Sequence, residues 1–215
     1  MAGEGIDFAG LRHPTSMVIA GASSSGKTLL TLRLMRDACK VFNPPPERCI
    51  FVCDSRQPSF QEFEPAVEFV DSLENVQFDH RPSILALDDL MTRVSDHICE
   101  WFTKGRHRNV SVIFLTQNVF HEDKRLRTIN TNAHHFVFMR SPRAPMQIAT
   151  LGRQVFGVGK GGVLQRIYEE ATRGKPYSYL WLDLSPHTDE RARVKSQFLP
   201  SDRTDASPYA VVYKF

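Results

Sequence analysis

Short, almost continuous runs of apolar residues recur along the chain, and segments with a helical spacing of apolar side chains separate them. The runs are SMVIA at 16–20, RCIFVC at 48–53, SILALDD at 83–89, VSVIFLTQN at 110–118, AHHFVFMR at 133–140 and PYSYLWLDLSP at 176–186. Continuous apolar runs of this length are typical of strands buried on both faces of a parallel sheet. Their alternation with helical patterns predicts an α/β fold with helices on both faces of the sheet.

Four segments between these runs have the spacing of a helix. Apolar residues recur every three to four positions in these segments, which are Lys27 to about Cys39, 90–109, APMQIATLGRQVF at 144–156 and VLQRIYEEAT at 163–172. The polar stretch 54–82 is expected to connect strands. We predict an N-terminal arm at 1–14, one domain at 15–185 and a C-terminal extension at 186–215.

Length and composition fit one globular domain that needs no metal or disulfide staples, because 215 residues with 41% hydrophobic content can form a sizeable core. Of the four cysteines, Cys49 and Cys53 share one face of a predicted strand, and we expect buried thiols there in preference to a metal pair. Reduced thiols indicate an intracellular protein. Neither a secretory leader nor a run of about 18 apolar residues is present, so secretion and membrane spanning are not predicted.

The overall charge of the chain is mild, but basic residues cluster at three places. The net charge of +3 and the pI near 8.7 permit nucleic-acid contact without indicating it. Basic residues cluster in KGRHRN at 104–109, KRLR at 124–127 and RSPR at 140–143. Two interpretations remain open: the clusters are ordinary solvated loops, or they line a path for a polyanion.

The sequence GASSSGKT at 21–28 fits the phosphate-binding pattern G-x-x-x-x-G-K-[ST] and lies between a predicted strand and a predicted helix, as the pattern requires. Glycines at both ends allow consecutive N–H groups to point into one concavity, to which the helix adds its positive end. The segment predicts a nucleotide-binding loop made of Gly21, Ala22, Ser23, Ser24, Ser25, Gly26, Lys27 and Thr28. Lys27 is expected to reach the β and γ phosphates, and Thr28 to offer its hydroxyl to Mg²⁺. ATP is favoured over GTP because the chain has no N-K-x-D segment.

Polar side chains at the ends of two other strands complete the predicted site. Asp88 is expected to hold Mg²⁺ through water, and Asp89 to polarise the attacking water. Gln117 is expected to contact the γ phosphate or that water at the carboxyl edge of the sheet. The alternatives are that the two acids cap a following helix and that the glutamine only forms a turn.

Together these segments resemble the FtsK-HerA superfamily of P-loop ATPases. Within it, the chain is similar to the genome-packaging ATPases of DNA viruses and Polinton-like elements, including the poxvirus type. The resemblance covers about 15–185, and its most specific part is GRHRNVSVIFLTQN at 105–118. It implies a RecA-like three-layer sandwich with a mainly parallel central sheet. It also implies an ATPase with Mg²⁺ that assembles as a ring, often hexameric, and drives double-stranded DNA into a capsid or portal vertex.

The resemblance carries further expectations and one departure. Many relatives have Asp-Glu where this chain has Asp88-Asp89. The Asp89 side chain is shorter than that of Glu, so its carboxylate would have to reach the attacking water from slightly farther away. Ring ATPases receive a cation from the neighbouring subunit, and Arg127, Arg140 and Arg143 are the candidates for it. The expected location is an infected host cell, in the nucleus or a cytoplasmic assembly site, or the virion. A helicase or conjugation-type motor, a small-molecule kinase and a nucleotide-dependent switch remain the alternatives.

Overall fold

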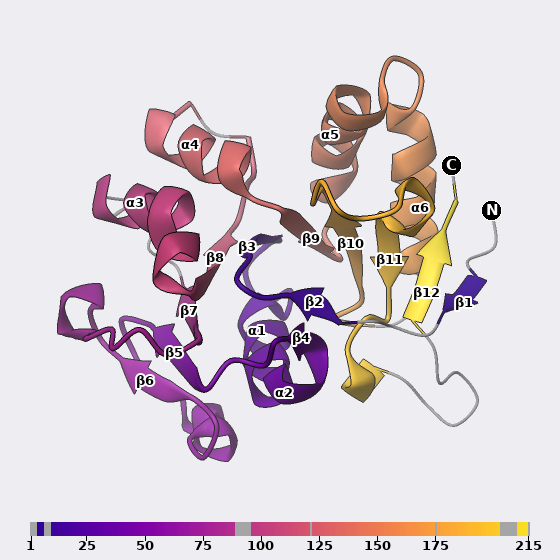
Figure 1. Ribbon diagram of the computed structural model, residues 1–215. Helices are drawn as coiled ribbons and strands as arrows, with labels where there is room; N and C mark the ends of the chain where they lie inside the picture. Colours follow the sequence, from indigo (N-terminus) through magenta and orange to yellow (C-terminus); the bar gives the residue numbers. More distant parts are fainter. Residues whose placement is uncertain are drawn as a thin grey trace.

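The computed structural model contains one large sheet that crosses the whole molecule, and it describes residues 4–6, 10–88, 96–120, 122–174, 176–202 and 210–214. The sheet is ten-stranded, in the order β1-β12-β11-β10-β9-β3-β8-β7-β5-β6 (Figure 1). A separate two-stranded parallel sheet pairs β2 (Leu11–Arg12) with β4 (Phe42–Asn43). β3, which leads into the phosphate-binding pattern, therefore lies inside the large sheet with neighbours on both sides.

Six neighbouring strands of the large sheet run parallel to one another. They are β9 (His135–Met139), β3 (Ser16–Ala20), β8 (Val110–Thr116), β7 (Ser83–Leu87), β5 (Arg48–Val52) and β6 (Glu68–Val70). Parallel strands bring all their carboxyl ends to one border of the sheet, which we call the carboxyl edge, and their amino ends to the opposite border, the amino edge. Side chains that follow β3, β7 and β8 consequently meet at the carboxyl edge.

The other four strands are antiparallel to their neighbours. β10 (Tyr179–Asp183) pairs with β9, β11 (Val194–Ser196) with β10, and β12 (Ala210–Tyr213) with β11 and with β1 (Glu4–Ile6). β1 comes from the segment predicted as an arm, and β11 and β12 come from the segment predicted as an extension. Both segments thus contribute strands to the same sheet as the predicted domain.

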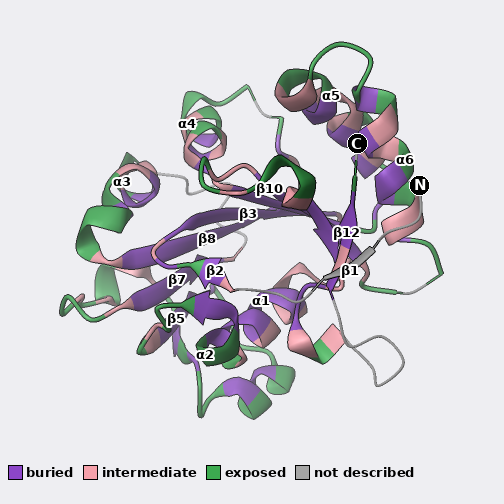
Figure 2. Ribbon diagram, turned by 45° about the vertical axis from the view of Figure 1, so that its right-hand side comes forward, coloured by how far each residue is buried: buried purple, intermediate pink, exposed green. Residues whose placement is uncertain are grey.

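Helices cover both faces of the sheet, which makes three layers. One face carries α1 (Lys27–Arg36), α2 (Ala38–Val41) and the 3-10 helix η1 (Pro58–Phe63); the other carries α3 (Asp96–Lys104), α4 (Lys124–Asn132), α5 (Ala144–Phe156) and α6 (Gly161–Ala171). Alternate strand residues separate accordingly, since Met17 and Ile19 pack with α1, and Val18 and Ala20 belong to the core under α3 to α6. The central strands β3, β7, β8, β9 and β10 are buried throughout, and the outer helix faces are exposed (Figure 2).

Shorter elements connect these layers. They are the 3-10 helices η2 (Leu73–Asn75), η4 (Gly105–Arg108), η5 (Glu190–Ala192) and η6 (Pro200–Asp202). β6 lies in the stretch predicted as a connector, and α4 occupies a stretch for which no helix was predicted. Each of the six predicted apolar runs contains a strand, so the predicted α/β fold with a mainly parallel sheet is confirmed.

The predicted burial of the paired thiols is also confirmed, because Cys49 and Cys53 are both buried in the core on the α1 face. Burial raises the pKa of Cys49 to about 12, so its thiol stays protonated at neutral pH. In the part of the chain that the structure describes, no helix has both the length and the apolar character needed to cross a bilayer.

Candidate functional site

The predicted phosphate-binding loop joins the carboxyl end of β3 to the first turn of α1, as the sequence pattern requires. Gly26 caps α1 with φ 96° and Ser24 has φ 60°, both in the left-handed region. A Cβ on Gly21 would lie 2.7 Å from Cβ of Met139. Both glycines are therefore needed, Gly26 for its backbone conformation and Gly21 for the close approach of β9. The loop backbone curls tightly around the start of α1.

Two side chains at the start of α1 are held by defined partners. Lys27 Nζ donates hydrogen bonds to the carbonyl oxygens of Gly21 at 2.9 Å and Ala22 at 3.0 Å, so its ammonium lies inside the curl of the loop. Thr28 Oγ1 donates to Oδ2 of Asp88 at 2.7 Å. Asp88 follows β7 directly, and its backbone N–H donates to the Val52 carbonyl at 3.0 Å. The predicted loop and the predicted carboxylate are thus in direct contact.

Two adjoining cavities open on either side of the loop and share Ser24, Lys27 and Thr28. The first, which we call the Asp88 cavity, has a volume of about 270 Å³ and is also lined by Asp88, Gln117, Cys53, Asp54 and Ser55. The second, the Tyr177 cavity, has a volume of about 330 Å³ and is also lined by Tyr177, Phe63, Leu29 and Leu32. Gln57 and Phe60 line both. The lining of the Asp88 cavity is mostly polar, whereas the Tyr177 cavity combines polar loop residues with aromatic and aliphatic side chains.

Gln117 lies where the sequence predicted it, in the residue after β8, and it lines the same cavity as Asp88. Oxygen and amide groups from β5, β7 and β8 converge there because these strands are parallel neighbours. Burial raises the pKa of the Cys53 thiol, and the charges of Asp88 and Asp54 raise it further. Two carboxylates thus contribute negative charge to the Asp88 cavity.

Tyr177 closes the opposite side of the loop. A Cβ on Gly26 would lie 2.6 Å from Cδ1 of the Tyr177 ring, so this side chain rests directly on the loop backbone. The tyrosine has φ 62° and is 53% exposed. Phe60 and Phe63 in the lining are buried, so the Tyr177 ring supplies the accessible aromatic surface of the cavity, which suits a flat apolar group.

The residues present fit a bound Mg²⁺. Thr28 and Asp88 offer a hydroxyl and a carboxylate oxygen already 2.7 Å apart, and oxygen is the donor that Mg²⁺ prefers. The crowding at Gly21 and Gly26 keeps side chains out of the loop where backbone N–H groups would meet phosphate oxygens. Both halves of a magnesium-phosphate site are therefore available at the carboxyl edge.

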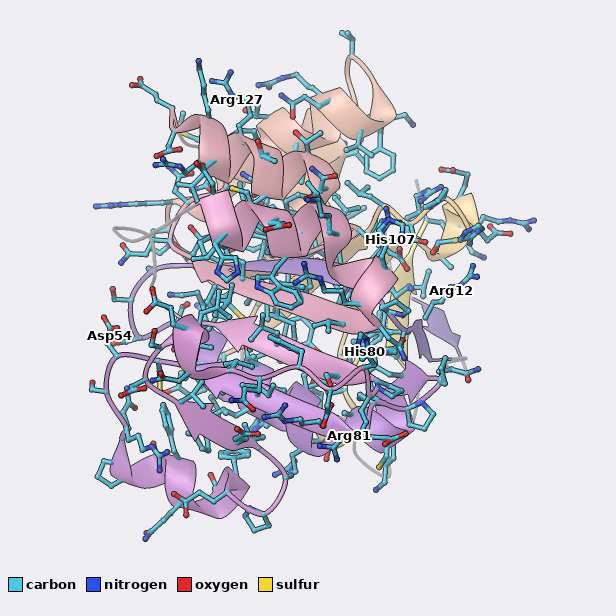
Figure 3. The ribbon with its side chains drawn as sticks, turned by 60° about the vertical axis from the view of Figure 1, so that its left-hand side comes forward. Arg12, Asp54, His80, Arg81, His107 and Arg127 are labelled. Carbon is cyan, nitrogen blue, oxygen red and sulfur yellow. The ribbon has the colours of Figure 1, made fainter. Side chains whose placement is uncertain are left out.

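The three predicted arginines do not line this site. Asp89 lies outside the described residues. Arg127 is exposed on α4 and lines a different cavity, Arg140 is exposed just after β9, and Arg143 caps α5. Neither cavity beside the loop is lined by any of these arginines. Figure 3 shows Arg127 well away from Asp54, which lines the Asp88 cavity. Within one chain, the lining of both loop cavities thus lacks the three predicted arginines.

The three basic clusters also lie apart. KGRHRN at 104–109 runs from the last residue of α3 through η4 into the amino end of β8, whereas RSPR at 140–143 follows the carboxyl end of β9. KRLR at 124–127 is the first turn of α4. The clusters at 104–109 and 140–143 are therefore at opposite edges of the sheet, and they do not form one continuous path along an edge.

Asp54, Gln57 and Tyr177 line the site but were not predicted. Asp54 comes soon after β5, the parallel neighbour of β7, and a rule that inspects polar residues after every strand would have found it. No local pattern indicates Tyr177, because the antiparallel pairing of β10 with β9 brings it to the loop.

No protein-family model and no curated protein sequence matches the chain, but solved structures do. The chain is similar to structures of the genome packaging NTPase B204 from Sulfolobus turreted icosahedral virus 2. The complex with AMP has a TM-score of 0.52 at 15% identity and covers 85% of this chain and 96% of that chain. The complex with AMPPCP has a TM-score of 0.51 at 16% identity and the same coverage. The chain therefore has the fold of a P-loop NTPase, as the sequence predicted.

Proposed function

We propose that the chain is an ATP-hydrolysing DNA translocase that packages a double-stranded viral genome into a capsid. The observation that carries the ATPase part is the convergence of Lys27, Thr28, Asp88 and Gln117 on one cavity beside a glycine-bounded loop. The fold shared with B204, a protein described as a genome packaging NTPase, supports the packaging part. The complexes of B204 with AMP and AMPPCP support a nucleotide as the ligand of the loop.

In this proposal each side chain has a separate task. The loop N–H groups and Lys27 bind the β and γ phosphates and compensate their charge. Thr28 and Asp88 hold Mg²⁺, which when bound neutralises phosphate charge. Gln117 orients the attacking water or contacts the γ phosphate, and Asp89 accepts the proton of that water. Catalysis here depends on positioning and charge, since phosphoryl transfer needs little covalent chemistry from the protein.

The aromatic walls of the Tyr177 cavity suit the adenine base. ATP bound across the loop would place its γ phosphate in the Asp88 cavity and its base against the Tyr177 ring, since the two cavities share Lys27 and Thr28. An aromatic ring stacked on a base contributes roughly 1 kcal/mol beyond the area it buries.

The proposed function includes assembly of several copies of the chain into a ring. No candidate arginine lines the cavities beside the loop of its own chain, so we propose that Arg127, Arg140 or Arg143 acts on the loop of the neighbouring subunit in a ring, hexameric in the first instance. Double-stranded DNA and a capsid or portal vertex are the proposed partners, inside an infected cell or in the virion. Another P-loop DNA motor, of the helicase or conjugation type, is the alternative.

The test measures ATP hydrolysis by the purified chain with and without duplex DNA. A DNA motor should be stimulated by the duplex, whereas a small-molecule kinase should ignore it and a switch should hydrolyse slowly in both conditions. Lys27→Ala should abolish hydrolysis, and Lys40→Ala, which removes an exposed ammonium on α2, should not. Hydrolysis that survives Lys27→Ala would refute the assignment of the loop.

A further inference from the structure

A further cavity lies at the amino edge of the sheet, away from the loop. It has a volume of about 420 Å³ and is lined by Arg12, Thr15, Arg106, His134, Asp183 and His187, among others. Thr15 precedes β3 and His134 precedes β9, whereas the loop follows the other end of β3. A five-residue strand spans roughly 17 Å. Figure 3 agrees, because Arg12 and His107 lie on the opposite side of the molecule from Asp54.

Positive charge is in excess around this amino-edge cavity. In the described part of the chain, neither Arg12 nor Arg106 has a carboxylate within salt-bridge distance, and both side chains are exposed. Asp183 is the carboxylate of the lining, and it is buried and already engaged. Lys195 Nζ lies 3.2 Å from its Oδ2, and the Ser185 N–H donates to its Oδ1 at 3.0 Å. The acid of the lining therefore leaves the two guanidiniums uncompensated.

The acidic residues that follow the lining are engaged as well. Glu190 is 2.6 Å from the Arg193 guanidinium, and Asp189 is 3.6 Å from that of Arg191. Among the described residues, these pairs leave no unpaired acid of this segment to neutralise Arg12 and Arg106, whose charges face a concave surface. Such a surface attracts an anion.

The hydrogen bonds of His134 hold Arg106 at the cavity. His134 Nε2 is 3.5 Å from Nη1 of Arg106, and a guanidinium can only donate, so Nε2 accepts. Nδ1 then carries the proton and donates to Ser16 Oγ at 3.1 Å, while that hydroxyl donates to the Asn132 carbonyl at 2.6 Å. This one contact places the Arg106 guanidinium beside His134 at the cavity and leaves most of its N–H donors for a ligand.

We propose that the amino-edge cavity is a second anion site that binds a phosphate group through Arg12 and Arg106, with His134 as the positioning residue of Arg106. Guanidinium groups match phosphate oxygens in shape and charge and bind them through paired N–H donors. The phosphate comes either from a nucleic-acid backbone or from a free phosphate. The site does not depend on ATP hydrolysis at the loop.

The first experiment titrates the wild-type chain with inorganic phosphate and follows the His134 imidazole by NMR, with the resonance assigned by loss in His134→Gln. Burial lowers the pKa of His134, and the charge of Arg106 lowers it further, while Asp183 opposes and His187 adds to this effect. A phosphate on Arg106 screens that repulsion, so the pKa of His134 should rise. The double variant Arg12→Gln/Arg106→Gln should lose this response to phosphate.

The second experiment measures the affinity of a 20-base-pair duplex by fluorescence anisotropy over a range of salt concentrations. If the phosphate belongs to a DNA backbone, the double variant should bind about tenfold more weakly, and the slope of log affinity against log salt should fall by roughly 2. The control Arg166→Gln/Arg173→Gln removes two exposed guanidiniums on and just after α6 and should bind like the wild type. Unchanged duplex binding together with a phosphate response at His134 assigns the site to free phosphate.

A wild-type His134 resonance that ignores phosphate, together with equal duplex affinity in the double variant and the wild type, overturns the proposal. A phosphate response that persists in the double variant overturns it as well. ATP hydrolysis without DNA, measured on the same variants, is read separately. If the wild type does not hydrolyse ATP, the proposed ATPase function is wrong, but the phosphate response of His134 can still be interpreted.

Discussion

The Thr28 hydroxyl donates to the Asp88 carboxylate across 2.7 Å, joining the first turn of α1 to the end of β7. Thr28 belongs to the phosphate-binding loop, and Asp88 lies sixty residues further along the chain. The contact fixes both oxygen atoms before any cation arrives, so little rearrangement is needed to form a metal site.

Replacing either partner should uncouple nucleotide binding from magnesium. For Asp88→Asn we expect ATP affinity in EDTA to be unchanged and the gain on adding Mg²⁺ to be lost, because the carboxylate charge is gone. Thr28→Ser should keep that gain and Thr28→Val should lose it. Isothermal titration with and without Mg²⁺ measures the difference, and Asp71→Asn, an exposed acid, serves as the control. A full magnesium gain in Asp88→Asn would remove this residue from the metal site.

Gln117 should matter to turnover more than to binding. Its amide lies in the Asp88 cavity, and a hydrogen bond made to the reacting groups is strongest in the transition state. We expect Gln117→Ala to lower kcat by about ten- to a hundredfold while ATP affinity changes less than about twofold. Steady-state kinetics and equilibrium binding separate the two, with Gln61→Ala, at an exposed position of η1, as the control. An equal loss in affinity and in kcat/KM would instead indicate a binding role.

Tyr177 should contribute to binding of the adenine base and not to binding of the phosphates. If adenine stacks on its ring, Tyr177→Ala should weaken ATP binding about five- to tenfold, whereas Tyr177→Phe, which keeps the ring, should not. Tripolyphosphate lacks a base, so its affinity should be the same in all three proteins. Competition against a fluorescent ATP analogue measures these affinities. Weaker tripolyphosphate binding in Tyr177→Ala would show that the ring supports the loop at Gly26 and not the base.

Acid should destabilise the fold through His135. Burial lowers the pKa of this imidazole to about 4, and the Trp181 indole N–H donates to its Nδ1 at 3.3 Å, which requires the neutral form. In the unfolded chain the imidazole has an ordinary pKa near 6.5 and takes up its proton first. The free energy of unfolding should therefore be fully retained above pH 6.5 and fall as pH drops from 6.5 towards 4, by up to about 1.4 kcal/mol per pH unit.

Urea unfolding followed by circular dichroism at several pH values measures this loss. His135→Gln cannot take up a proton, so its stability should depend less on pH over the same range, whatever its absolute value. His80→Gln, at an exposed position, should leave the wild-type slope in place. Parallel pH slopes for wild type and His135→Gln would assign the acid sensitivity to other groups, of which His13 and His134 also have a lowered pKa because of burial.

The features that could be predicted from the sequence are those formed by residues close together in the chain. The loop at 21–28 is eight consecutive residues whose task follows from their types. Asp88 and Gln117 were found because the carboxyl ends of parallel strands meet at one edge. The helix α4 was missed because only Leu126 and Ile129 are buried in a segment that is otherwise polar or charged.

Features assembled from distant segments gave no such signal. Tyr177 reaches the loop only because β10 runs antiparallel to β9, and strand direction cannot be read from an apolar run. The amino-edge cavity combines residues 10–15, Arg106, residues 134–135 and residues 183–188. No spacing rule relates these segments, since their proximity comes from sheet order. The charges in the cavity were visible in the sequence, but their shared location was not.

The pairing of Glu4 with Val212 has a consequence for the order in which the molecule folds. Among the described strands, β1 comes earliest in the sequence and its partner in the sheet, β12, comes latest. Contacts that close so long a loop form slowly, since the chain loses more entropy before the contact stabilises it. During synthesis β1 therefore leaves the ribosome long before its partner, and this border of the sheet should be the last part of the protein to assemble.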